Sequence, residues 1–198
     1  MPEWFGSRHG QKVQRKVINS ISPERRYREL GNQLEVSDTV ATRSALADEC
    51  LTLGKFEEAK LHFDEILDRH MGDEPLFMLG RARAEFGLGA PEKAVATLDE
   101  LRRRWPDFQS ADGHLLYARA LHEANRHDEA LEEFAAVSNY YSGAEARVRW
   151  GQVLDALGRR QEARAVFRDV LLRYKNAPFH AKEMQAEWLA IAERELRK

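Results

Sequence analysis

Four stretches of the sequence repeat one pattern of apolar and polar positions. In each stretch, an apolar-periodic run leads into a short turn and restarts with Glu or Lys shortly before a small Ala. One apolar residue follows that Ala by four positions and another by seven, which is the spacing of a single stripe along a helix. The Ala-to-Ala spacings are 35, 36 and 33 residues. The members of the pattern, in chain order, are Ala59, Phe63, Ile66; Ala94, Leu98, Leu101; Ala130, Phe134, Val137; and Ala163, Phe167, Val170.

The turn in each stretch is marked by a residue type that adopts a positive φ angle easily. Such a residue at the end of a helix permits a tight antiparallel reversal, and the small Ala beyond it lets the two helices approach closely. One helical hairpin cannot bury both of its faces, so we expect neighbouring hairpins to stack. The turn residues are Gly54, Gly87–Gly89, Asn125 and Gly158.

The repeat length, the turn Gly and the Ala-x3-Phe spacing together resemble the tetratricopeptide repeat. The resemblance covers about residues 38–178. It implies an all-α fold, a right-handed superhelical solenoid of antiparallel helix pairs. We expect four repeats, at about residues 38–72, 73–108, 111–143 and 144–178.

The sequence departs from the family pattern in four features, one of which is Asn125 in place of the turn Gly in the third repeat. The turn of the second repeat is two residues longer than that of the first, and Pro91 is well placed to open the following helix. Arg83 stands where an apolar residue is usual, and Arg43 stands where the family often has Trp. These departures leave the predicted fold unchanged.

Helices are also predicted on both sides of the repeats. The segment 22–37 begins with Ser-Pro-Glu, a typical helix start, and we interpret it as a leading half-repeat. Residues 179–198 predict one further helix that caps the open end of the stack. The apolar face of this helix consists of Ala181, Met184, Trp188 and Ile191.

Charge is distributed unevenly along the chain. Residues 1–28 carry seven basic and two acidic side chains, a net charge of +5, whereas the remainder carries 24 basic and 31 acidic side chains, a net charge of −7. A basic segment suits lipid headgroups or another acidic surface, and a frayed, solvated terminus is the alternative. We therefore expect residues 1–21 to form a basic head that is either juxtamembrane or flexible.

A second resemblance concerns the N-terminal half of the chain. The run RRYRELGNQLEVSDTVATRSALADECLTLGKFEEA, with HLLYARAL downstream, looks like the soluble part of certain bacterial tetratricopeptide proteins. In those proteins a short hydrophobic hairpin precedes the repeats, whereas this sequence has no run of 18 or more apolar residues. The resemblance implies a cytoplasmic protein, which in its full-length form would be associated with the anionic surface of the inner membrane through residues 1–21.

No catalytic, metal-binding or cofactor-binding residues are predicted. His122 and His127, in HEANRH, are one residue too far apart for the H-E-x-x-H zinc motif and flank a turn. The run GLGAPEK matches neither the P-loop nor a dinucleotide-binding loop. Cys50 falls where the first helix of a repeat packs inward, so we interpret it as a small core residue. We expect no enzyme activity, no cofactor and no small-molecule substrate.

The family resemblance implies that the first helix of each repeat lines a concave groove. Leu115, Phe77 and Val148 would form an apolar strip flanked by Arg81 and Arg119, which suits a helix or extended segment with apolar anchors and an acidic group. The alternative is that each Arg pairs with the Glu four residues further on. The candidate partner-binding residues are Asp48, Phe77, Arg81, Glu85, Leu115, Arg119, His122, Gln152 and Asp155.

These features predict a protein–protein interaction scaffold that binds a peptide or helix of a partner. One alternative is a nucleic-acid-associated adaptor that uses the basic head, although the acidic remainder of the chain disfavours phosphate binding. A second alternative is a structural protein that associates with itself through Trp188 and the last helix.

Overall fold

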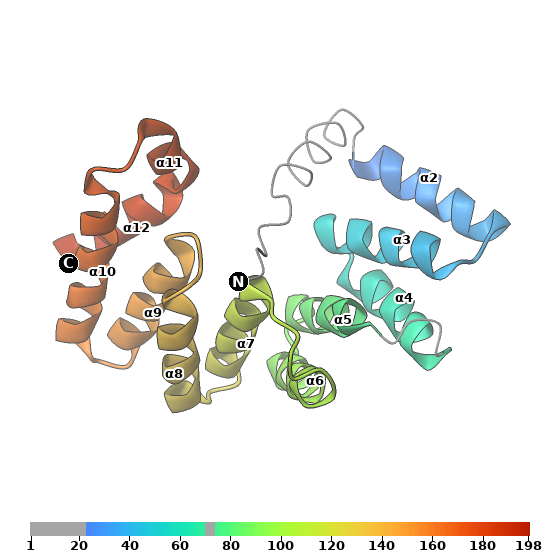
Figure 1. Cartoon of the computed structure of the whole chain (residues 1–198), viewed down its shortest axis with the longest axis horizontal. Coiled ribbons are helices and arrows are strands. Elements are labelled where there is room, and N and C mark those ends of the chain that lie inside the picture. The colour runs from blue at the N-terminus through green and yellow to red at the C-terminus, as the bar shows by residue number, and fades with distance from the viewer. Residues whose placement is uncertain (1–22, 70–73) are drawn as a thin grey trace, which may run out of the picture. The chain divides into compact units, whose positions relative to one another are not determined.

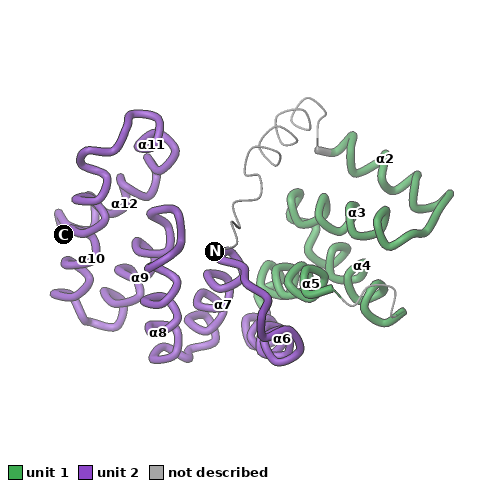
Figure 2. The backbone as a smooth tube through the Cα atoms, in the orientation of Figure 1, with its two compact units in different colours: residues 1–89 green, residues 90–198 purple. Residues whose placement is uncertain are grey.

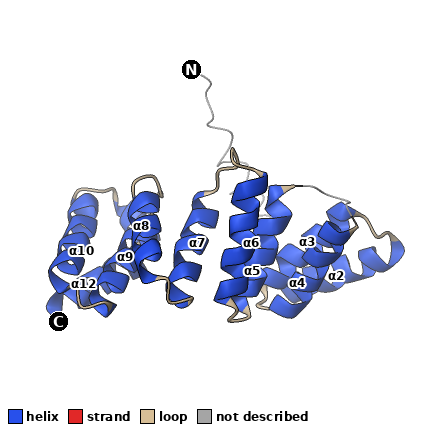
Figure 3. Ribbon diagram, turned by 90° about the horizontal axis from the view of Figure 1, so that it is seen from below, coloured by secondary structure: helices blue, strands red, loops and turns tan. Residues whose placement is uncertain are grey.

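The computed structural model describes residues 23–69 and 74–198, and within these ranges every regular element is an α-helix (Figure 3). The predicted basic head, residues 1–21, lies outside the described residues. The predicted all-α solenoid of helix pairs is confirmed: eleven helices follow one another along the described chain and pack mainly against their neighbours in sequence (Figure 1).

The chain forms two compact units, which meet in sequence between Gly89 and Ala90 (Figure 2). This boundary falls in the long turn of the second predicted repeat. The described helices of the first unit are α2 (Pro23–Val36), α3 (Val40–Thr52), α4 (Phe56–Asp68) and α5 (Pro75–Gly87). Those of the second unit are α6 (Pro91–Arg104), α7 (Ala111–Glu123), α8 (His127–Ser138), α9 (Glu145–Ala156), α10 (Arg160–Lys175), α11 (Phe179–Met184) and α12 (Ala186–Arg197).

The turns between successive helices use the residues that the sequence predicts. Asn125 has a φ angle of 60°, and Gly54, Gly89 and Gly158 have φ angles of 72°, 70° and 79°. A residue in this left-handed region lets the next N–H group bond back to a carbonyl in the last turn of the helix. Three such bonds close the α3–α4, α7–α8 and α9–α10 turns: Lys55 to Cys50 at 2.8 Å, Arg126 to Leu121 at 2.9 Å and Arg159 to Leu154 at 2.9 Å.

The predicted apolar stripes form the cores of both units. The four small Ala residues of the pattern are at most 1% exposed, and the apolar residues that follow them by four and seven positions are at most 5% exposed. Close helix approach also depends on two first-helix glycines, Gly80 and Gly151. A Cβ atom at Gly151 would lie 2.5 Å from the ring of Phe167, and a Cβ atom at Gly80 would overlap the ring of Phe63.

An ion-pair cluster occupies the place where the family often has Trp. Arg43 is 9% exposed, and its Nε and Nη2 atoms donate to the two carboxylate oxygens of Asp38 at 3.0 and 2.7 Å. Arg43 also pairs with Glu65, and Arg69 donates to Asp38 at 2.6 Å. These guanidinium groups lower the pKa of Asp38 to about 2. The aliphatic stem of Arg43 thus fills space while its charge stays paired.

The C-terminal segment differs from the single helix that the sequence predicts. Gln185 interrupts it, with φ and ψ angles of −114° and 9°, so that α11 has six residues and α12 has twelve. The side-chain oxygen of Gln185 accepts a hydrogen bond from the N–H group of Ala144 at 2.9 Å. This hydrogen bond connects the break between α11 and α12 with the loop before α9. As a result Met184 is 58% exposed, whereas Trp188 on α12 is half-buried.

Candidate protein-binding site

Alternate helices of the second unit lie on the same side. In sequence, α7 packs against α8, α8 against α9, α9 against α10, and α10 against α12; α12 also contacts α9 directly. The last helix therefore occupies the place that the first helix of a further repeat would take. We call the side formed by α7, α9 and α12 the first-helix face of the second unit.

Four predicted partner-binding residues of this unit are at least partly exposed on the first helices. Arg119 and His122 lie on α7, and Gln152 and Asp155 lie on α9. Leu115 is different, because it is only 4% exposed. Its position faces the packed interior of the unit, and it cannot serve as an exposed apolar anchor. Val148, at the equivalent position of the next repeat, is fully buried for the same reason.

One contact on this face, between Arg149 and Trp188, does not follow from the sequence pattern. The guanidinium group of Arg149 lies 4.9 Å from the centre of the Trp188 ring, and its Nε atom is 2.8 Å from the Glu145 carboxylate. Glu145 and Arg149 are four residues apart on α9, a spacing that predicts an ion pair. The contact with Trp188 could not be predicted, because it depends on where α12 packs.

Arg119 and Arg149 place two positive charges close together on the first-helix face. Burial of the Arg119 guanidinium group and the charge of Arg149 lower the pKa of Arg119, while Glu145 and Glu123 oppose the shift. Burial is the larger of the two lowering causes, because it disfavours the charged form of a guanidinium group. This part of the face therefore combines two partly buried guanidinium groups, the carboxylates of Glu145 and Glu123, and an aromatic ring.

The predicted residues of the first unit lie on α3 and α5. The Nε atom of Arg81 is 3.1 Å from Glu85 and 3.3 Å from Asp64, and Glu85 is only 2% exposed. The structure thus shows the alternative in which Arg81 pairs with the Glu one turn further on. Glu85 is consequently not an open contact residue. Phe77 is half-buried against the core of this unit, and Asp48 is exposed.

No group of three or more His, Cys, Asp and Glu side chains within the described ranges could hold a metal ion. The rings of His122 and His127, on different helices, are 5.2 Å apart. Cys50 is fully buried, and its burial, together with the charge of Glu58, raises its pKa to about 11. In the part of the chain that the structure describes, no helix is long and apolar enough to cross a membrane.

The family model of the tetratricopeptide repeat matches residues 44–107 and 118–181, which is more than half of the chain. Together with the helix pairs, the turn geometry and the buried Ala stripe, this match identifies the family. The chain belongs to the tetratricopeptide repeat family. No curated protein matches the chain at a significant level.

Solved structures of other tetratricopeptide proteins share the fold. One is the structure of MamA, from residue 41 to its end, from Desulfovibrio magneticus RS-1. Its sequence is 13% identical to this chain and the TM-score is 0.70; the match covers 85% of this chain and 95% of the MamA chain. TTC0263, a protein of Thermus thermophilus, is 17% identical to this chain with a TM-score of 0.68. The match covers 94% of this chain and 95% of TTC0263. YrrB, described as having an unusual peptide-binding site, is 17% identical to this chain with a TM-score of 0.67. The match covers 92% of this chain and 87% of YrrB.

Proposed function

We propose that this protein is a non-enzymatic scaffold that binds an extended or helical segment of a partner protein on the first-helix faces of its repeats. The family assignment supports a role in protein–protein interaction, since helical repeats present extended surfaces to their partners. The similar fold of YrrB, a protein with a peptide-binding site, is consistent with this role.

The observation that carries the proposal is the pairing of charge and aromatic surface on the second unit. The charge of Arg149 acts on Arg119, and the guanidinium group of Arg149 lies 4.9 Å from the centre of the Trp188 ring. Charge-assisted hydrogen bonds from Arg select carboxylates, and aromatic side chains are enriched among residues that dominate binding energy. We infer that the bound segment carries an acidic residue next to an apolar one.

Replacing Arg119 by Glu should weaken binding of such segments by about ten- to a hundredfold, because a charge-assisted hydrogen bond contributes about 1.5–3 kcal/mol. The measurement starts from a displayed library of random peptides selected on the full chain. The enriched peptides are then titrated by calorimetry against wild type and against the variant. We expect the enriched peptides to share an acidic residue flanked by apolar residues.

The matched control for this experiment is Lys93→Glu, which makes the same change of charge at an exposed position near the start of α6. This variant should bind the enriched peptides as wild type does. If those peptides bind Arg119→Glu with wild-type affinity, the first-helix face of the second unit is not the binding site.

A second proposal concerns the basic head, residues 1–21, which carries four basic side chains and one acidic side chain, a net charge of +3. We propose that this segment contacts the anionic surface of the bacterial inner membrane and so keeps the scaffold near it. Basic residues near such a surface contribute about 1 kcal/mol each, and salt screens the attraction.

The full chain should therefore sediment with vesicles that contain anionic lipid, be released by added salt, and bind neutral vesicles much less. Changing Lys12, Arg15 and Lys16 together to Gln should abolish the preference for anionic vesicles. Equal binding to anionic and neutral vesicles would contradict the proposal, because a charge-based contact must distinguish the two surfaces.

A further inference from the structure

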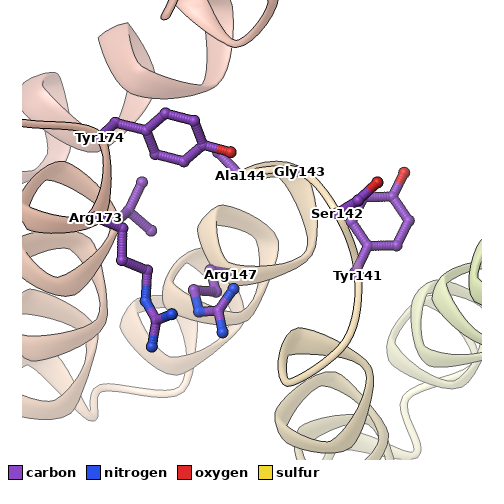
Figure 4. Close-up of a pocket in the computed structure, with 8 residues that line it drawn as sticks. Tyr141, Ser142, Gly143, Ala144, Arg147, Arg173 and Tyr174 are labelled. Atoms are coloured by element: carbon purple, nitrogen blue, oxygen red, sulfur yellow. The ribbon is translucent and has the colours of Figure 1, made fainter. Parts of the chain in front are cut away.

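A cavity of about 400 Å³ lies within the second unit, between the loop that precedes α9 and the C-terminal half of α10 (Figure 4). Its walls include Tyr141 and Ala144 from the loop, Arg147 from α9, and Arg173 and Tyr174 from α10. Figure 4 shows the Tyr174 ring extending toward Ala144, with the two guanidinium groups next to each other below it. The volume falls within the range of about 300–1,000 Å³ that is typical of ligand pockets.

Two of the residues that line this cavity are basic, and both are paired with one carboxylate. The Nε atoms of Arg147 and Arg173 lie 3.4 and 2.6 Å from the same oxygen of Asp169, so that one carboxylate serves two guanidinium groups. No described residue that lines the cavity is acidic. The side chain of Arg147 is only 13% exposed, and both its burial and the charge of Arg173 lower its pKa. An anion in the cavity would relieve this repulsion.

The N-terminus of α9 lies beside the cavity, because Ala144, which precedes the helix, is one of the lining residues. Helix α9 begins directly after Ala144, has no side chain that caps its first N–H groups, and carries the acidic Glu145 in its first turn. These groups form the positive end of the helix dipole, which attracts negative charge. The N–H group of Ala144 itself is bonded to Gln185, and this bond holds the loop in place beside the cavity.

We propose that this cavity binds a carboxylate group of a peptide. Two guanidinium groups and one carboxylate leave a net charge of +1, which a carboxylate neutralises and a doubly charged phosphate would exceed. The planar guanidinium forks match the geometry of a carboxylate, and the remaining volume holds the residue that bears it. Arg147 lies two positions from Arg149 and so points to another side of α9. The site is therefore independent of the proposed first-helix face.

The test is an NMR titration of the full chain, which follows the side-chain Nε–Hε signals of its arginines at constant ionic strength. Three probes are used: a blocked tri-alanine with a free C-terminal carboxylate, a blocked Ala-Glu-Ala amide, and the uncharged tri-alanine amide. The Arg147 and Arg173 signals should shift saturably with at least one carboxylate probe and stay unchanged with the amide. The probe that acts shows whether the ligand is a C-terminal or a side-chain carboxylate.

Arg173→Gln should weaken the binding seen at Arg147 at least tenfold, whereas Arg168→Gln, at an exposed position on the same helix, should leave it unchanged. Inorganic phosphate should bind more weakly than the carboxylate probe that acts. The proposal is overturned if neither carboxylate probe causes a saturable shift, in which case the arginines only form an ion-pair cluster with Asp169. Tighter binding of phosphate would overturn it as well.

Discussion

Replacing Phe134 by Ala should lower the free energy of unfolding of the second unit by about 3–5 kcal/mol. The ring is 1% exposed and lies on α8, which packs against both α7 and α9. Its removal takes apolar contacts from two helix interfaces at once and leaves a cavity that the rigid hairpins cannot fill. A loss of this size is a large part of the total stability of a small unit.

The measurement is urea unfolding followed by tryptophan fluorescence, which reports mainly on the second unit because Trp105, Trp150 and Trp188 all lie there. Phe179→Ala is the matched control, since the Phe179 ring is 82% exposed and its loss should change stability by no more than about 0.5 kcal/mol. If Phe134→Ala does not fold, Phe134→Leu supplies a milder test. Equal effects at positions 134 and 179 would show that the proposed helix register is wrong.

The second large effect is expected at a glycine. Gly151→Ala should destabilise the protein by about 1–3 kcal/mol, because the new methyl group would lie 2.5 Å from the Phe167 ring. The ring is 2% exposed and cannot move outward without opening the contact between α9 and α10. Calorimetry or far-ultraviolet circular dichroism during heating gives the change in melting temperature.

The same substitution at Gly31 should have the opposite sign. Gly31 lies inside α2, and a Cβ atom added there would meet nothing within 4 Å. Ala is favoured over Gly in a helix interior by about 0.5–1 kcal/mol. Gly31→Ala should therefore raise the melting temperature while Gly151→Ala lowers it. A rise for both variants would show that propensity alone acts at position 151 and that the two helices are not in close contact.

The repeats could be predicted from sequence because their signal is local and recurs. Ala130, Phe134 and Val137 lie on one stripe, and the same stripe returns in each repeat at nearly constant spacing. The turn at Asn125 could also be predicted, because few residues other than Gly adopt a positive φ angle at low cost. Such short-range constraints determine the helices, the reversals between them and the buried face of each hairpin.

The remaining features depend on contacts between residues far apart in the chain. Nothing near Gln185 marks a helix end, and its side-chain oxygen accepts a hydrogen bond from the N–H group of Ala144, 41 residues away. The cavity arginines, Arg147 and Arg173, are not part of the repeat pattern and meet only because α9 and α10 pack together. Leu115 was expected to be exposed in the groove, because the family pattern gives its position along the first helix. The pattern does not give the exposure of its side chain, which depends on the helices that pack around it.

The burial of Cys50 makes the protein well suited to site-specific chemical labelling. With a pKa of about 11, only about one thiol in ten thousand is ionised at pH 7, and the thiolate is the species that reacts with maleimides. The sulfur is also shielded from reagents, since the residue is fully buried. A single cysteine introduced at the partly exposed Gln152 would thus become the reactive thiol of the chain. A fluorophore attached there would report directly on occupancy of the first-helix face, with no need to remove the native cysteine.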